Sequence, residues 1–411
     1  MLSTFTRGDR VQILILLLCL VPFVATIFLG VAADDPWAVV LSTGLAIASA
    51  GFALAWGTES LQFIVSQALA LAVLAVVNVL PEYSVEVVLA YKGATDSTLL
   101  HFATASMTGA NRILLGLGWP VVFVLNWVSS RRAGRPSASL VLEQGQGPGV
   151  AFLAVATLYS FVIAVKGTLG PEDAVVYLSI FAVYVYAAGR MPARSGELAE
   201  ELEGPSKAVS GLRGPFKVLA IVFFVAIGGV AIAFGSEPFI ANFLALASTL
   251  KLGGSTQYLL IQWLTPVLTE LPEAVTVFYW AATTGKAPMA LSSLISSKLN
   301  QWTILVATIP VVYDIALGGF GSIHLSPLQV EEILLTAAQS LYGVVCLLDL
   351  KLGKFDASAL LGLFLVQFFV PEVRLEVTAA YLVLAAFEFA RNPDRLGPFR
   401  SMGAALRGHV H

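Results

Sequence analysis

The sequence predicts an all-α, polytopic membrane protein, and its composition and the length of its apolar runs carry this prediction. Hydrophobic residues make up 57% of the 411 residues, and charged residues only 12%. Because a soluble domain carries about 25% charged residues, this chain cannot cover itself with a polar surface. Several apolar runs also exceed the ~20 residues with which an α-helix crosses a bilayer. The lipid bilayer is therefore the first partner that we expect.

About twelve apolar runs are predicted as transmembrane helices, each bounded by turn residues and charges. The first is long for a signal peptide and lacks a clear cleavage site, so we expect a retained helix. The run 216–250 is too long for an upright helix, so it either tilts or breaks near Gly235-Ser236-Glu237-Pro238. The predicted spans lie at about 11–32, 36–56, 60–92, 97–127, 149–166, 172–189, 216–250, 256–284, 287–317, 328–350, 356–370 and 373–390.

One polar segment, residues 190–215, separates the two halves of the chain and is predicted to be a solvated linker. Basic residues gather before the first span and after the fourth, the tenth and the last. With twelve spans these groups and the linker fall on one side of the membrane, and the positive-inside rule makes that side cytoplasmic. We therefore expect both termini in the cytoplasm, and the protein in the plasma membrane.

Two short stretches of the chain look like copies of each other. One reads Asn78-Val79-Leu80-Pro81-Glu82, and the other reads Thr269-Glu270-Leu271-Pro272-Glu273. Proline breaks a helix because it removes a backbone donor, and a carboxylate inside a hydrocarbon span indicates a functional site. A broken, acidic helix in each half predicts a transporter with its site near the bilayer midplane. We expect the carboxylates of Glu82 and Glu273 to approach within ~10 Å.

The predicted span count gives the two Leu-Pro-Glu helices opposite directions across the membrane. Spans two to six and seven to eleven then form two inverted-topology five-helix repeats plus one extra helix at each end. The predicted boundaries are 36–189 for the first repeat with its motif region at 78–118, 216–370 for the second with its motif region at 269–302, and 1–35 and 371–411 for the flanking helices and tail.

The helix that follows each Leu-Pro-Glu motif offers neutral oxygens. The first reads Ser106-Met107-Thr108-Gly109-Ala110-Asn111, and the second reads Ser292-Ser293-Leu294-Ile295-Ser296-Ser297-Lys298. A hard cation binds carboxylate, hydroxyl, amide and backbone carbonyl oxygens. Each proline leaves the carbonyl four residues earlier without its helical donor, which adds acceptors near Val77 and Leu268. Serine and threonine also serve as contacts between membrane helices.

This pattern resembles the α-repeats of the sodium/calcium exchanger family, in the cation/calcium antiporter superfamily. In that family the first helix of a repeat carries Ser-Leu-Pro-Glu, and the second carries Gly-Asn-x-x-Gly-Ser-Asn. The resemblance implies a secondary-active antiporter that exchanges Ca²⁺ or another cation for Na⁺ or H⁺ by alternating access. The two Leu-Pro-Glu helix breaks would form its midplane site.

The residues and the resemblance together give a set of candidate cation ligands. Glu82 and Glu273 come first, and Glu86 either lines the path or faces the outer leaflet. Thr108, Ser292 and Ser296 are weaker candidates. The predicted ligands are Asn78, Glu82, Ser106, Asn111, Thr269, Glu270, Glu273, Ser293 and Ser297.

The chain departs from the family pattern in the charge that it places near this site. Ser106 and Ser293 occupy the place of the family's first asparagine, and Glu270 replaces the motif serine of the second repeat. Lys298 stands where the second repeat should carry Asn or Asp, opposite Asn111 in the first. An extra carboxylate and an extra ammonium in one repeat look like a matched pair.

Lys298 lies well inside the predicted span 287–317, so it changes the chemistry of the site. A desolvated lysine can titrate near neutral pH, take the place of a sodium ion and couple transport to protons. The alternative is a permanent salt bridge to Glu270 or Glu273, which lowers the number of ions bound. Both interpretations place the ammonium within reach of Glu270 or Glu273, and both leave less charge for Ca²⁺ than the family pattern provides.

Other classes of protein fit the sequence less well. A cation channel would favour a continuous polar pore, and a transport-inactive family member would act as a sensor or scaffold. Tyr313-Asp314 gives only half of an intramembrane aspartyl protease signature, and no HExxH zinc motif occurs, so we expect no enzyme. The net charge of −3 indicates no nucleic-acid partner. We expect no cofactor: inorganic cations (Ca²⁺, Na⁺ or H⁺) are the substrates. The oligomeric state is not given by the sequence.

Overall fold

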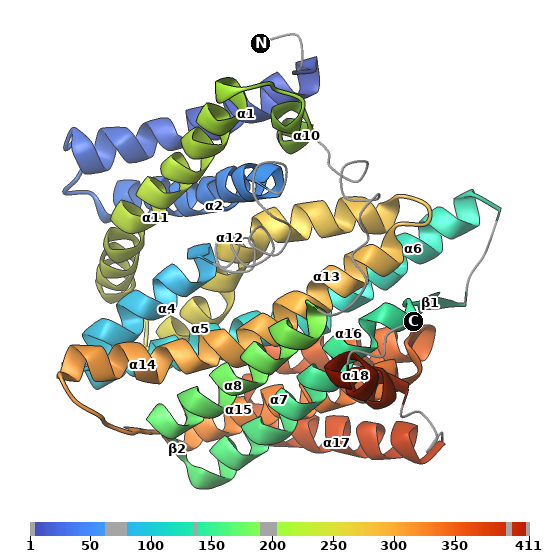
Figure 1. The fold of residues 1–411 in the computed structure, drawn as a ribbon. Coiled ribbons are helices and arrows are strands. Elements are labelled where there is room, and N and C mark those ends of the chain that lie inside the picture. The colour runs from blue at the N-terminus through green and yellow to red at the C-terminus, as the bar shows by residue number, and fades with distance from the viewer. Residues whose placement is uncertain (1–4, 62–79, 135–137, 190–203, 392–396, 408–411) are drawn as a thin grey trace. The chain divides into compact units, whose positions relative to one another are not determined.

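The computed structural model describes residues 5–61, 80–134, 138–189, 204–391 and 397–407 (Figure 1). Within these ranges the chain is almost wholly helical, which confirms the predicted all-α class. Eight of the described helices are long and apolar enough to cross a bilayer. The chain forms two compact units, each drawn from both halves of the sequence. The first comprises Met1–Leu89 and Ala193–Glu273, and the second comprises Ala90–Pro192 and Ala274–His411.

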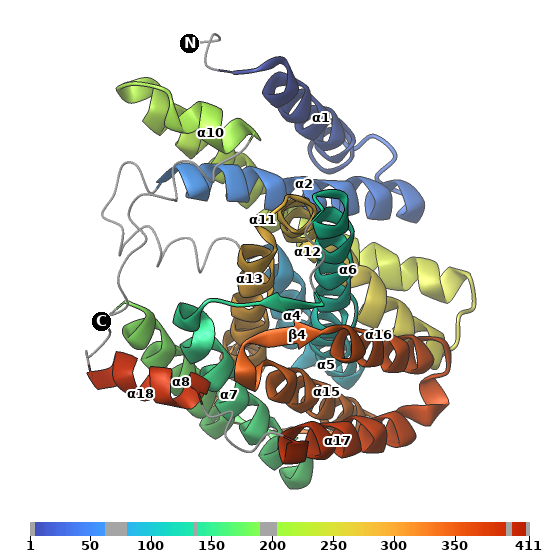
Figure 2. The same cartoon turned by 90° about the vertical axis from the view of Figure 1, so that its right-hand side faces the viewer.

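In the first unit, helices α1 (Arg7–Phe23), α2 (Pro36–Leu61) and α11 (Pro215–Thr249) pack together (Figures 1 and 2). A capping box starts α1, because the Thr6 and Asp9 side chains each accept a hydrogen bond from the other's backbone N–H. The short π-helix η2 (Val24–Phe28) continues α1. The core of the unit is apolar and includes Leu20, Ala50 and Phe224.

The structure decides between two alternatives for one run of this unit and corrects one expectation. The run 216–250 does not break near Pro238, because α11 is one continuous helix with that proline inside it. Likewise α12 (Gly254–Ala282) runs unbroken through Pro266 and Pro272, so the expected break at the second Leu-Pro-Glu motif is wrong. A membrane helix tolerates proline when the surrounding protein and small local adjustments satisfy the freed carbonyl.

The first Leu-Pro-Glu motif lies in α4 (Leu80–Gly93). The residues before Leu80 lie outside the described part of the chain, and so does any break there. The 190–215 linker also differs from a wholly solvated connector. Its residues Gly204–Ser210 form helix α10, which packs on α1 and α2 with Ser206 and Val209 buried.

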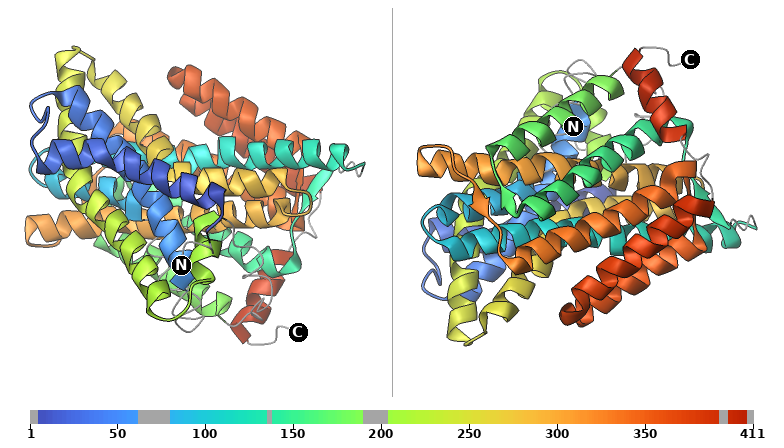
Figure 3. Two further views of the ribbon diagram at one scale, coloured as in Figure 1. Left: turned by 90° about the horizontal axis from the view of Figure 1, so that it is seen from above. Right: turned by 90° about the horizontal axis from the view of Figure 1, so that it is seen from below.

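Two long interrupted helices cross the second unit side by side in opposite directions (Figures 1 and 3). The first consists of α5 (Ser97–Ile113), the π-helix η3 (Leu114–Gly118) and α6 (Trp119–Arg132). The second consists of α13 (Ala287–Asn300), the π-helix η5 (Gln301–Leu305) and α14 (Val306–Leu317). Helix α13 packs on α6, and η5 packs on α5, as an antiparallel pair requires.

The remaining helices of the second unit support this pair. α15 packs on α5, α7 and α17, and α16 packs on η3 and α6 (Figure 2). Gly116 of η3 permits that approach, because a Cβ there would lie 2.5 Å from Cγ of Phe364. The bounds are α7 (Gly147–Lys166), α8 (Pro171–Ala188), α15 (Pro327–Cys346), α16 (Lys354–Phe369), α17 (Arg374–Arg391) and α18 (Gly397–Arg407), with 3₁₀ turns η4 (Gln144–Gln146), η6 (Leu347–Asp349) and η7 (Pro371–Val373).

Two short antiparallel ribbons, which the sequence did not predict, tie loops together. Strand β1 (Ser139–Val141) pairs with β4 (Lys351–Gly353), with Leu140 opposite Leu352. Strand β2 (Thr168–Leu169) pairs with β3 (Ile323–His324), with Thr168 opposite His324. Strands of two or three residues give too short an alternation to be recognised in sequence.

Candidate cation-binding site

The carboxylates of the two Leu-Pro-Glu motifs belong to the first compact unit. Glu82 lies in the first turn of α4 with 6% of its surface exposed, and Glu273 lies half-buried on α12. Glu270 and Thr269 on α12 are 9% and 8% exposed. Protein around them thus replaces most of the solvent that a carboxylate would otherwise have. The expected approach of Glu82 to Glu273 stays a prediction, and Asn78 lies outside the described residues.

Three of the candidate hydroxyl groups, one on a predicted ligand and two on weaker candidates, are held by the backbone of their own helices. The Thr269 hydroxyl donates to the carbonyl of Thr265 at 3.2 Å, and the Thr108 hydroxyl donates to the carbonyl of Thr104 at 2.8 Å. The Ser292 hydroxyl donates to the carbonyl of Pro288 at 2.8 Å. Since a hydroxyl that donates its proton keeps its oxygen lone pairs, these contacts orient an acceptor without consuming it.

The second motif helices of the two repeats differ in how deeply they bury the predicted ligands. Ser106 and Asn111 on α5 are fully buried. Ser293 and Ser297 on α13 are half-buried, and Ser296 is exposed. Burial therefore favours the stronger candidates over Ser296, whose position on the outer face of α13 suits a packing role.

Lys298 and Asn111 bond directly to each other inside the second unit. Nζ of Lys298 donates to Oδ1 of Asn111 at 2.8 Å and to its backbone carbonyl at 3.0 Å, and both residues are 0% exposed. The same ammonium lies 4.7 Å from the ring centroid of Trp302. Nδ2 of Asn111 donates to the carbonyl of Met107 at 2.9 Å, which turns the amide oxygen toward the lysine. The ammonium therefore does not snorkel to a headgroup layer.

The Lys298–Asn111 contact joins the two residues that occupy equivalent positions in the two sequence motifs. The predicted proximity of Lys298 to Glu270 or Glu273 is a different contact, between residues of the two compact units, and it stays a prediction. An ammonium that binds an amide oxygen and a carbonyl occupies oxygens of the kind that a hard cation uses. The second repeat thus supplies a tethered positive charge to an acceptor pair of the first.

Two π-helices mark equivalent places in the two interrupted helices. η3 begins at Leu114, three residues after Asn111 (114 − 111 = 3), and η5 begins at Gln301, three residues after Lys298 (301 − 298 = 3). The Trp119 N–H donates to the carbonyl of Leu114, five residues earlier. Such π-bulges occur frequently at functional sites. Their matched positions support the equivalence of Asn111 and Lys298, although no clear sequence pattern predicts a π-helix at either place.

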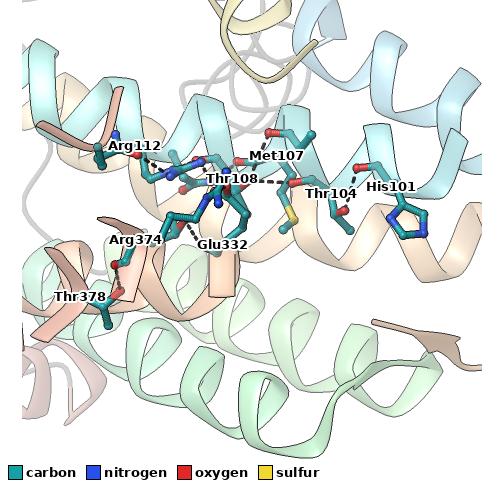
Figure 4. Close-up of polar contacts among 12 residues, drawn as sticks. His101, Thr104, Met107, Thr108, Arg112, Glu332, Arg374 and Thr378 are labelled. Atoms are coloured by element: carbon teal, nitrogen blue, oxygen red, sulfur yellow. Dashed lines mark hydrogen bonds and ion pairs between the residues drawn. The ribbon is translucent and has the colours of Figure 1, made fainter. Parts of the chain in front are cut away.

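A buried ion cluster is formed by Arg112, which follows Asn111 in the chain, and it was not predicted from the sequence (Figure 4). The Arg112 guanidinium forms an ion pair with Glu332 of α15, and each side chain is 1% exposed. Nε of Arg374 on α17 donates to the other Glu332 oxygen at 2.6 Å. Charged residues inside membrane helices are a functional signal. That signal was present in the spans 97–127 and 328–350, but only the fold shows that the three charges meet.

The fold and the buried polar residues together define a polytopic α-helical secondary transporter. A family model described as sodium/calcium exchanger protein matches residues 36–189. The crystal structure of an H⁺/Ca²⁺ exchanger, CAX, is 32% identical, with 98% of this chain and 99% of that chain covered and a TM-score of 0.88. This chain therefore belongs to the sodium/calcium exchanger family, whose members carry ions as substrates and are not enzymes.

More distant structures share the fold. The sodium-calcium exchanger NCX_Mj, soaked with Na⁺ and Ca²⁺, gives a TM-score of 0.52 at 16% identity, over 82% of this chain and 98% of that chain. The same exchanger soaked with Na⁺ and Sr²⁺ gives a TM-score of 0.53 at the same identity and coverage. A search of the curated proteins finds no match. The chain is thus an integral membrane protein and a cation antiporter by family.

Proposed function

We propose that this protein exchanges Ca²⁺ for protons across a membrane by alternating access, with Glu82 and Glu273 as the carboxylates of the transport site. The likeness to an H⁺/Ca²⁺ exchanger at 32% identity over nearly the whole chain supports the choice of ions. Two carboxylates can hold either one divalent cation or two protons, so the charge of the loaded site is the same at both stages of the cycle. Protons and Ca²⁺ then compete for one pair of groups.

One observation carries the choice of protons over sodium: Lys298 is fully buried, with its ammonium on two oxygens of Asn111. A tethered ammonium supplies the positive charge that a bound Na⁺ would bring to those oxygens. The polar oxygens of that position are then already satisfied, and a separate Na⁺ ion loses a ligand pair. The carboxylates remain for the transported ions, with hydroxyls of Ser106, Thr269 and Ser293 as neutral ligands.

We also propose that the protein lies in the plasma membrane. Both termini then lie in the cytoplasm, because that orientation places the basic loops on the side that the positive-inside rule requires.

Glutamine variants test the transport site. Glu82→Gln and Glu273→Gln each keep the shape of the side chain and remove its charge, so each should abolish Ca²⁺ flux in proteoliposomes while the protein still elutes as a folded species. Glu376→Gln is the matched control, because Glu376 is an exposed residue of α17. Wild-type flux in either Glu82→Gln or Glu273→Gln would remove that carboxylate from the site.

Removing the tethered charge tests the role of Lys298. Lys298→Asn restores a neutral ligand and leaves the carboxylates unbalanced, so cation binding should tighten and the pH dependence of exchange should weaken. Lys354→Asn, at an exposed lysine that starts α16, is the control. An unchanged cation affinity together with an unchanged pH profile in Lys298→Asn would show that the lysine is purely structural. A variant that gains Na⁺-driven Ca²⁺ flux would support the replacement of Na⁺ directly.

A further inference from the structure

Arg112 directly follows Asn111 in the sequence but is not one of the proposed ligands. Its side chain is 1% exposed, and its guanidinium binds groups on two other helices and on its own helix. It pairs with Glu332 of α15, and its Nε donates to the carbonyl of Thr108 at 3.3 Å (Figure 4). Its Nη1 donates to Oε1 of Gln367 of α16 at 2.6 Å. One side chain thus connects the end of α5 to two supporting helices.

A buried arginine is an unfavourable choice if its role is only to hold helices together. Taking a guanidinium and a carboxylate out of water carries a desolvation penalty that apolar packing does not, so such pairs are weak evidence for a role in stability alone. Within this cluster the charges of Arg112 and Arg374 exceed that of Glu332 by one, so it is not a simple neutral pair. The planar guanidinium does offer a fixed geometry that apolar side chains do not, because its five donors form a rigid fork.

The last turn of α5 is where side-chain donors reach the backbone. Arg112 donates to the carbonyl of Thr108, as described above. In addition, Lys298 donates to the carbonyl of Asn111 at 3.0 Å, and Nε2 of Gln339 donates to the carbonyl of Arg112 at 3.4 Å. This turn immediately precedes the π-helix η3. A π-helix displaces carbonyls from their usual i, i+4 partners, so these oxygens become available to side chains. Their position depends on how the end of α5 is held.

We propose that Arg112 is a positioning residue for transport: bound to Glu332 and Gln367, it fixes the last turn of α5 so that the oxygens of Asn111 hold the Lys298 ammonium in place. This inference rests on the proposed function. When the turn shifts, the ammonium loses these acceptors and competes with the transported cation for other oxygen ligands. Arg112 therefore affects cation affinity only through Lys298.

A double-variant experiment in proteoliposomes tests this positioning role. Arg112→Lys keeps a positive charge beside Glu332 but cannot reproduce the fork. The KM for Ca²⁺ should rise by about tenfold or more, the range typical of residues that orient a metal ligand, with a smaller change in maximal rate. In the Lys298→Asn background the same Arg112→Lys change should not alter the KM, because no ammonium remains to be released. Arg131→Gln, at an exposed arginine in the last turn of α6, is the control.

Two outcomes overturn the proposal: an equal rise in KM with and without Lys298, or a fall in maximal rate and protein yield with the KM unchanged. If Arg112→Lys does not fold, Gln367→Met removes one acceptor of the guanidinium, leaves the ion pair in place, and should raise the KM in the same Lys298-dependent way. The proposed function fails separately, through wild-type flux in Glu82→Gln or Glu273→Gln.

Discussion

Gly51 of α2 is the residue whose substitution should most directly disturb the second Leu-Pro-Glu motif. A Cβ at this position would lie 2.5 Å from Cγ and 3.2 Å from Cβ of Pro272. Carbon atoms in good contact are about 3.5–4.0 Å apart, so Gly51→Ala is short of space by about 1 Å. The proline ring is locked to its own backbone and cannot rotate away, so α2 and α12 must move apart.

The magnitude follows from two opposing effects. Overpacking of this kind costs about 1–3 kcal/mol, whereas alanine in place of glycine inside a helix stabilises by roughly 0.5–1 kcal/mol. The net expectation is a destabilisation of about 1–2 kcal/mol. Because Glu273 directly follows Pro272, the displacement also reaches the proposed transport carboxylate. The rate of exchange should fall by roughly tenfold or more, as for other misplaced ligand groups.

The assay compares the melting temperature of purified protein with the Ca²⁺ flux in proteoliposomes for three glycine variants. Gly229→Ala is the matched control in a neighbouring helix, because a Cβ there meets nothing within 4 Å. Gly44→Ala is intermediate, since its Cβ would lie 3.4 Å from Phe239 and 3.7 Å from Leu268. If Gly51→Ala melts and transports like Gly229→Ala, then α2 and α12 do not hold the motif as described.

Two further predictions concern other parts of the fold. Asp173 is fully buried and accepts hydrogen bonds from the Tyr159 hydroxyl at 2.8 Å and from Lys166 at 2.6 Å. Asp173→Ala should therefore lower stability by roughly 2–3 kcal/mol, measured as a lower melting temperature. A change in melting temperature equal to that of Glu376→Gln would contradict a stabilising role of Asp173. Cys346 is 1% exposed, whereas Cys19 is partly exposed. A membrane-permeant maleimide should therefore label Cys19 first, which mass spectrometry can check. Faster labelling of Cys346 would show that the packing of α15 differs from that described.

The helical part of the fold could be predicted closely from the sequence, because long apolar helices correspond to continuous apolar runs. The predicted span 287–317 matches α13, η5 and α14 residue for residue. What failed was the effect of proline: the sequence shows that Pro272 lacks a donor, but only the packing around it decides whether the helix breaks. The ribbon strands and α10 are too short for a periodic pattern to reveal them.

The site was predictable only in part, because its chemistry depends on contacts between distant segments. The alignment of the two motifs made Lys298 and Asn111 equivalent positions. Their hydrogen bond joins residues 187 positions apart, however, and could not be predicted from the spacing of residues within either motif. The Arg112–Glu332 pair is similar, since each charge is visible in its own span and neither indicates its partner. A sequence records which groups a membrane helix carries, whereas the fold decides which of them meet.

The most direct test of proton-coupled exchange is Ca²⁺ uptake by proteoliposomes under one imposed gradient at a time. With an outward proton gradient and no sodium present, we predict saturable Ca²⁺ uptake accompanied by proton efflux, and no uptake in the Glu82→Gln and Glu273→Gln variants. An outward sodium gradient at equal pH should drive no uptake. Uptake that requires sodium and ignores the proton gradient would contradict the proposal, as would an unsaturable flux of the size that a channel carries.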